Sequence, residues 1–194
     1  MSKKNLKYVI FLVVVIVILF LCSVGLVLFL KEIKESQKVP VDETDVSFVA
    51  DSNTIIIKNI ISVSEDFGKN IDEENGGAFG YLEFEVLNHT DQNRNFQVFI
   101  TKLTPTIKEI NSSYVTFYLT NYSNIPFDDY TGNKLPSYDD FHYIEDKADS
   151  KSIYKGSIGP NESQHFILRV WIADNFVVSN TEESFSFEID ARAV

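Results

Sequence analysis

The sequence predicts an all-β fold, an immunoglobulin-like antiparallel β-sandwich, that follows a single N-terminal transmembrane helix. From residue 46 onward, apolar residues recur at every second position in about eight short segments, as in strands that bury one face. Turns rich in Asn, Asp, Gly and Ser separate these segments, and no long amphipathic helical pattern interrupts them. Many short alternating strands without helices are typical of a sandwich or a barrel. An immunoglobulin-like sandwich is the favoured form.

Five segments show the strand alternation most clearly. Residues 81–87, for example, place Leu82, Phe84 and Val86 on one face, with Glu83 and Glu85 on the other. The other clear segments are residues 95–103, 114–120, 165–172 and 184–191, and weaker candidates are residues 46–50, 54–63 and 152–157.

The N-terminal part contains an apolar run at residues 8–30 without a single charge. As a helix it spans about 35 Å, enough to cross the hydrocarbon core of a bilayer. A cleavable signal peptide has a shorter apolar core and a small-residue cleavage site, so the run is interpreted as an uncleaved signal-anchor. Cys22, the only cysteine, follows Leu19, Phe20 and Leu21 instead of the small residues of a lipidation motif. It is interpreted as a packing residue within the membrane, which leaves the rest of the chain without disulfides.

The predicted organisation has four parts along the chain. They are a cytoplasmic tail at residues 1–7, the single-pass plasma-membrane anchor at 8–30, a stalk at 31–45 and an extracytoplasmic β-sandwich domain at 46–194. Three lysines lie on each side of the apolar run, so the charge bias does not fix its orientation. An N-inside orientation is favoured because the predicted fold is common outside cells.

The charge of the chain excludes one class of partner. The whole chain carries 17 basic and 28 acidic residues, and three of the lysines lie before the apolar run. Residues 31–194 therefore hold 14 basic and 28 acidic residues, a net charge of −14. Nucleic-acid binding needs a basic face, so no nucleic-acid partner is expected. Anionic lipid headgroups should also repel this domain.

The stretch at residues 122–151 is the least regular, and it is rich in acidic and aromatic residues. A loop of this length is often functional, so it is favoured as a recognition surface that adds little to the core. In the alternative, aromatic residues such as Phe127, Tyr138 and Phe141 pack under the sandwich. Carboxylates at 128, 129, 139 and 140 also raise the hypothesis of a calcium site. Without a D-x-D-x-D-G motif they are interpreted as solvated, and no metal site is predicted.

Enzymatic motifs are absent from the sequence. His89, His142 and His165 are scattered without metal-ligand spacing, and no H-E-x-x-H, G-x-S-x-G, P-loop or G-x-G-x-x-G sequence occurs. No catalytic or cofactor-binding residue and no cofactor is therefore predicted. Arg169 is expected to have a structural role, stacking on an aromatic ring or pairing with a carboxylate. Trp171 shares its strand face with His165 and Arg169, so it is expected to be only partly buried.

Two sequence stretches resemble a known group of proteins. Residues 112–119 read S-x-Y-V-x-F-x-L, and residues 156–172 read G-S-I-G-P-N-E-S-Q-H-F-I-L-R-V-W-I, which includes Leu168, Arg169, Trp171 and Ile172. This pattern resembles the small exported β-sandwich surface proteins of low-GC Gram-positive bacteria, broadly the camelysin and TasA type. The resemblance implies a surface or matrix protein. Proteins of that type carry a cleavable signal peptide, and the uncut anchor departs from this.

Three hypotheses for the function follow. The favoured one is a non-enzymatic, membrane-anchored surface protein whose β-sandwich contacts other proteins or cell-wall polymer. The second is an extracytoplasmic accessory subunit of a membrane complex, in which the helix makes the contact. The third is a metal-dependent hydrolase. The sequence does not indicate whether the protein binds a small molecule.

Overall fold

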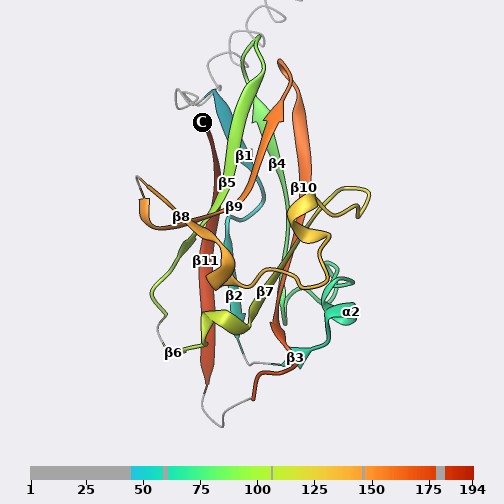
Figure 1. The fold of residues 1–194 in the computed structure, drawn as a ribbon, viewed down its shortest axis with the longest axis vertical. Coiled ribbons are helices and arrows are strands. Elements are labelled where there is room, and N and C mark those ends of the chain that lie inside the picture. Colours follow the sequence, from blue (N-terminus) through green and yellow to red (C-terminus); the bar gives the residue numbers. More distant parts are fainter. Residues whose placement is uncertain (1–44, 59–60, 106, 146, 178–181) are drawn as a thin grey trace, which may run out of the picture. The chain divides into compact units, whose positions relative to one another are not determined.

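The computed structural model describes residues 45–194 except 59–60, 106, 146 and 178–181. It shows two β-sheets and very little helix, which confirms the predicted all-β class and supports a β-sandwich (Figure 1). The described residues belong to one compact unit, Thr44–Val194. Within them, no helix is long and apolar enough to cross a membrane. The predicted anchor at 8–30, the tail before it and residues 31–44 of the predicted stalk lie outside the described residues.

The first sheet has the order β1-β4-β10, with β7 on the other side of β10 and β3 beside the end of β10. All of its pairs are antiparallel except the short parallel pair of β10 and β3. Its strands are β1 (Val46–Val49), β3 (Ser62–Val63), β4 (Gly80–Asn88), β7 (Val115–Asn121) and β10 (Ser163–Ala173).

The second sheet has the order β2-β11-β5-β9-β8, and β6 runs parallel beside β11. Its strands are β2 (Thr54–Lys58), β5 (Arg94–Lys102), β6 (Lys108–Glu109), β8 (His142–Ile144), β9 (Lys147–Ile158) and β11 (Glu183–Ala193). Four short helical turns complete the described elements: α2 (Glu65–Gly68), η1 (Ser112–Tyr114), η2 (Asp128–Tyr130) and η3 (Tyr138–Asp140).

Strand alternation places the core between the two sheets. Large aromatic rings fill it: Phe166 of β10 stacks on Phe84 of the neighbouring β4 at 4.9 Å and contacts Phe96 of β5, in the other sheet, at 6.1 Å. Phe117 of β7 lies 5.4 Å from Phe187 of β11. These rings are buried, as the alternation predicted, because each lies on the inward face of its strand.

The five clearest predicted strands are present, within about two residues of the expected ends. The weaker candidate at 54–63 instead forms two strands, β2 and β3, that belong to different sheets. The candidate at 152–157 is part of the longer β9. Strands β6 and β8 and helix α2 were not predicted, because elements of two to four residues carry too little periodicity.

Strand β10 is buried on both faces, so the predicted partial exposure of Trp171 is wrong. Its side chain is only 1% exposed. The outer face of the strand is covered by α2 and the residues that follow it, and a Cβ placed on Gly68 would lie 2.2 Å from the indole. The absence of a side chain at Gly68 is therefore what lets the helix lie directly on the ring.

Arg169 fixes the same covering segment to the sheet. Its guanidinium donates hydrogen bonds to the Ile71 carbonyl at 2.6 Å, Thr120 Oγ1 at 3.2 Å and Asn124 Oδ1 at 2.6 Å. The guanidinium carbon also lies 5.8 Å from the centre of the Tyr81 ring. Burial lowers the pKa of Arg169. The geometry agrees with the structural role expected from the sequence, with an aromatic ring and uncharged acceptors around the cation.

The segment 122–141 forms a side wall of the sandwich, which overturns the expectation that the irregular loop adds little to the core. Its backbone bonds to the free edge of β7, where the Phe117 amide donates to Pro136 at 3.0 Å and the Phe127 amide to Leu119 at 3.3 Å. Tyr130, 1% exposed, extends to the other sheet and donates from its hydroxyl to the Ile153 carbonyl at 2.8 Å. Residues 122–141 therefore fit the alternative that the sequence left open, in which aromatic residues of the loop pack against the sandwich.

Candidate functional site

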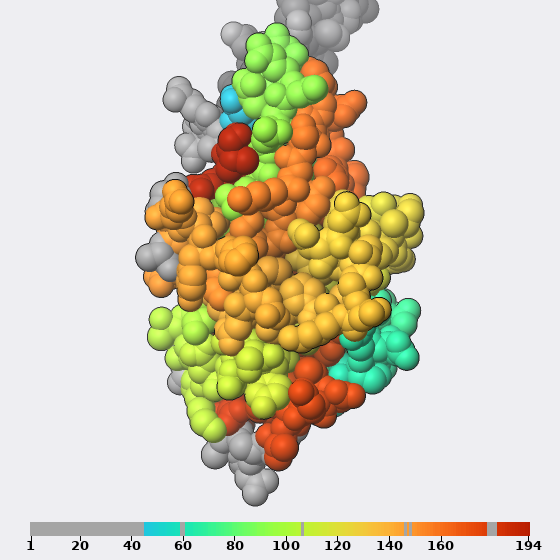
Figure 2. Space-filling model, viewed as in Figure 1, coloured from blue at the N-terminus to red at the C-terminus, as the bar shows by residue number. Residues whose placement is uncertain are grey.

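The side wall and strand β9 enclose a groove of about 850 Å³. Figure 2 shows this face, where the yellow-to-gold segment 122–145 lies beside the orange β9. The groove combines aromatic rings with charges of both signs. Its lining includes Phe141, Tyr143 and Tyr154, the acidic residues Asp129, Asp140 and Glu145, and the basic residues Lys155 and Arg192.

Strand β8 positions the most exposed of these rings. It pairs with the first half of β9 only, with Tyr143 opposite Lys151 and a register shift just after this pair. Tyr143 is 63% exposed, whereas the next residue, Ile144, is buried. The opposite burial of two successive side chains follows from strand alternation. Because β8 pairs only with the first half of β9, the second half of β9, which holds Tyr154 and Lys155, lines the groove without a partner from β8.

Lys151 lies beneath Tyr143 and is itself buried, with 4% of its surface exposed. Its ammonium donates to the Tyr138 carbonyl at 3.0 Å. The ammonium lies 4.5 Å from the centre of the Tyr138 ring and 4.7 Å from that of Tyr143. Burial lowers the pKa of Lys151, against the opposing effect of nearby Asp139 and Asp140. Burial also raises the pKa of Tyr138 to about 12, so this phenol is neutral at ordinary pH.

The paired carboxylates at 139 and 140 support the local fold. Asp140 accepts hydrogen bonds from the backbone amide and the hydroxyl of Ser137, at 2.8 and 2.7 Å, and caps η3. These bonds lower the pKa of Asp140, so it is ionised at neutral pH. Asp139 accepts from the Ser112 hydroxyl at 2.7 Å. Across the part of the chain that the structure describes, no three His, Cys, Asp or Glu side chains gather as a metal site. The geometry therefore gives the calcium hypothesis no support.

A second hollow of about 440 Å³ continues the groove along the same wall. Both share Asp129, Tyr154 and Lys155, and the second adds Ile125 and Phe127. The Tyr154 ring lies 4.6 Å from that of Phe127. The two adjoining hollows together are called here the side groove.

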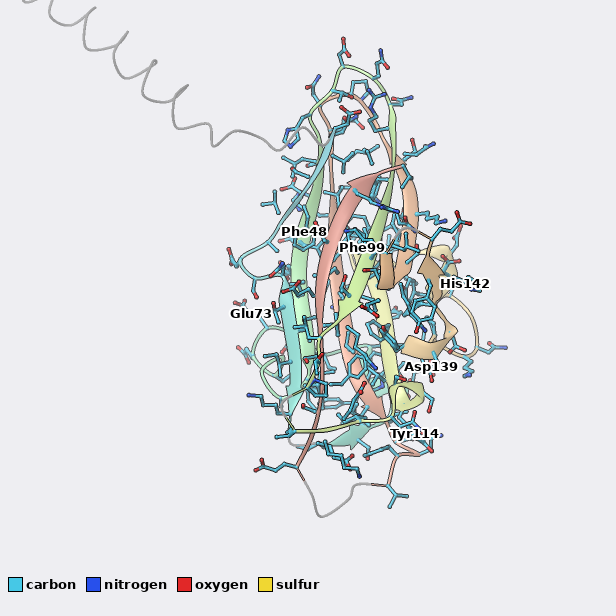
Figure 3. The ribbon with its side chains drawn as sticks, turned by 90° about the vertical axis from the view of Figure 1, so that its left-hand side faces the viewer. Phe48, Glu73, Phe99, Tyr114, Asp139 and His142 are labelled. Atoms are coloured by element: carbon cyan, nitrogen blue, oxygen red, sulfur yellow. The ribbon has the colours of Figure 1, made fainter. Side chains whose placement is uncertain are left out.

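The three histidines lie in different parts of the fold. His142 lines the side groove, and Figure 3 shows it on the same side of the molecule as Asp139, opposite Phe48 and Glu73. His89 lies 2.7 Å from the Ser47 hydroxyl, and His165 lies 3.2 Å from Glu85.

The sequence analysis favoured the loop at residues 122–151 as a recognition surface, but it did not predict the groove. Its residues come from β5, the side wall, β8, β9 and β11, and no short motif links segments so far apart. The accumulation of aromatic and acidic residues at 122–151 was the one available signal. Neither the comparison with protein-family models nor the search of curated proteins found a match for this chain.

Proposed function

We propose that this protein is a non-enzymatic surface protein of a bacterial envelope that binds an envelope partner through the side groove. Residues 8–30 anchor it in the plasma membrane, and residues 46–194 lie outside. The observation that carries the proposal is the side groove, where an exposed tyrosine ring lies among carboxylates, cations and half-buried aromatic side chains. Concave sites with apolar walls and a few convergent polar groups are the usual form of binding sites.

The chemistry of Asp140 fits binding better than catalysis. A carboxylate pair that cleaves glycosidic bonds needs one member with a raised pKa, so that it can donate a proton. Asp140 has a lowered pKa because Ser137 donates two hydrogen bonds to it. It is an acceptor held in place, which suits recognition of hydroxyl or amide donors.

The stretches 112–119 and 156–172, which carry the camelysin and TasA resemblance, meet where β7 pairs with β10, with Val115 opposite Ile172 and Leu119 opposite Leu168. The stretch 156–172 turns from β9 in one sheet to β10 in the other. Asn88, at the end of β4, donates from its side chain to the Gly159 carbonyl at 2.8 Å and to the Gln92 carbonyl at 2.7 Å. These hydrogen bonds hold the turn between β9 and β10, which gives this part of the motif a structural role. This role supports the proposal that the domain is an immunoglobulin-like sandwich of that type.

The outside location is supported by the charge-free apolar run and by the acidic, cysteine-free domain that follows it. A cysteine placed at Asp91, an exposed turn position, should react with a membrane-impermeant maleimide on intact cells. Ser150 is only 2% exposed, so a cysteine there is the matched control and should stay unlabelled while the domain is folded. The wild-type chain, with Cys22 alone, gives the background. Labelling of Asp91→Cys only after lysis would contradict the proposed orientation.

A further inference from the structure

Tyr143 presents an aromatic ring to solvent in a fixed position. An exposed side chain ordinarily moves among rotamers, and ordering it on binding carries an entropic cost. Here the Lys151 ammonium lies under the ring, and the Tyr138 carbonyl and ring hold that ammonium. Tyr138 in turn packs against Phe185 at 5.2 Å. The exposed ring is thus supported from the core outward, which reduces the ordering cost when a ligand stacks on it.

The side groove carries charges of both signs, with the acidic side chains in excess. Its lining includes four acidic residues, Asp128, Asp129, Asp140 and Glu145, and two basic residues, Lys155 and Arg192. The domain around them carries a strong net negative charge, which opposes polyanions such as phosphate-linked polymers. A polycation would meet Lys155 and Arg192. The charge pattern therefore favours a ligand that is itself uncharged and rich in hydrogen-bonding groups.

The succession of two adjoining hollows favours a chain over a compact molecule. The two hollows share one wall and join through Asp129, Tyr154 and Lys155. Aromatic rings recur along them, from Tyr143 past Tyr154 to Phe127. The apolar faces of successive sugar rings stack on such side chains, and their hydroxyls bond to carboxylates and amides between them.

We propose that the side groove binds a neutral polysaccharide chain, that Tyr143 is the ring on which one sugar stacks, and that Lys151 positions this ring. This inference rests on the proposed function and names the partner's chemistry. An extended polypeptide would also use a groove beside a strand. The presence of both charge signs in the groove and the supported, exposed ring favour the sugar.

The test uses the full chain in detergent micelles, titrated calorimetrically with hexamers of β-1,4-linked N-acetylglucosamine and of β-1,4-linked glucose. At least one hexamer should bind. Tyr143→Ala should weaken that binding about tenfold, because the stacking surface is lost, while Tyr143→Phe should retain it. Tyr122→Ala is the matched control, since Tyr122 is 70% exposed and does not line the groove. Binding of neither hexamer at millimolar concentration would overturn the inference.

Lys151 is tested by Lys151→Met and Lys151→Arg. If Lys151 positions the ring, Lys151→Met should weaken hexamer binding while the melting temperature stays near that of the wild type. Lys151→Arg, which keeps the charge, should bind the hexamer as the wild type does. If Met lowers only the melting temperature and the folded protein binds normally, Lys151 has a structural role alone.

A parallel sedimentation assay with isolated envelope fragments separates this inference from the proposed function. If Tyr143→Ala abolishes sedimentation but neither hexamer binds, the partner is not a neutral sugar chain, while envelope binding through the groove stands. A tryptic envelope-peptide digest that competes in this assay would identify a polypeptide partner instead. If Tyr143→Ala and wild type sediment equally, both proposals fail.

Discussion

Replacing Tyr130 with alanine should destabilise the domain by about 3–5 kcal/mol, as for a large aromatic side chain of a core. Although Tyr130 lies in an irregular segment, its ring is 1% exposed and its hydroxyl bonds to the Ile153 carbonyl on the opposite sheet. The substitution removes the packing between wall and sheets and the hydrogen bond to the Ile153 carbonyl. Urea unfolding followed by tryptophan fluorescence measures the effect, because the chain has one tryptophan and it is buried in this domain.

Tyr122→Ala is the control for this prediction. Tyr122 is in the same segment but is 70% exposed, so its loss should change the free energy of unfolding by at most about 0.5 kcal/mol. Tyr130→Phe isolates the hydroxyl and should cost about 0.5–1.5 kcal/mol, the usual net contribution of a hydrogen bond. Equal, small effects of Tyr130→Ala and Tyr122→Ala would mean that segment 122–141 is not a wall of the sandwich.

Replacing Trp171 with alanine should cost about 3–5 kcal/mol, at least as much as Leu168→Ala on the opposite face of β10. Both side chains are almost completely buried. A partly buried Trp171, as expected from the sequence, would instead cost less than Leu168. Because the substitution removes the fluorescent probe, urea unfolding should be followed by far-ultraviolet circular dichroism. A cost well below that of Leu168→Ala would show that the outer cover of β10 is loose.

The same contact can be tested from the covering helix. In Gly68→Ala the new Cβ would lie 2.2–2.6 Å from three atoms of the Trp171 indole, so the helix or the ring must shift. Overpacking of this kind costs about 1–3 kcal/mol. Gly77→Ala is the matched control, because a Cβ there meets nothing within 4 Å. Similar effects of the two substitutions would argue against the tight contact.

Strand periodicity was sufficient to predict the main strands and the inward residues between the sheets. It was not sufficient to predict the burial of the outer face of β10. Polar residues such as Arg169 alternate along this face, which is typical of an exposed face, yet much of the face is covered. His165 is exposed at one end of that strand, whereas Arg169, further along, is buried and bonds to the Ile71 carbonyl of the covering segment. Which parts of a polar face are covered depends on a segment elsewhere in the chain, and the local pattern of the strand does not contain that information.

The side wall shows the same limit for single residues. Tyr122 and Tyr130 are eight positions apart, identical in type and similar in local composition, yet they differ from 70% to 1% in exposure. Their difference comes from the bonds of the wall to β7 and of Tyr130 to β9. The groove depends on the same long-range contacts, so composition indicated the loop but not the residues that line it.

Hydrogen exchange of the full chain in detergent micelles, with and without soluble envelope fragments released by a muramidase, tests the central claim most directly. The account predicts slower amide exchange at residues 139–145 and 152–155, which border the side groove, with little change elsewhere in the domain. Protection confined to the strands β1 and β2, far in sequence from the groove, or no protection at all, would contradict the assignment of the side groove as the envelope-binding surface.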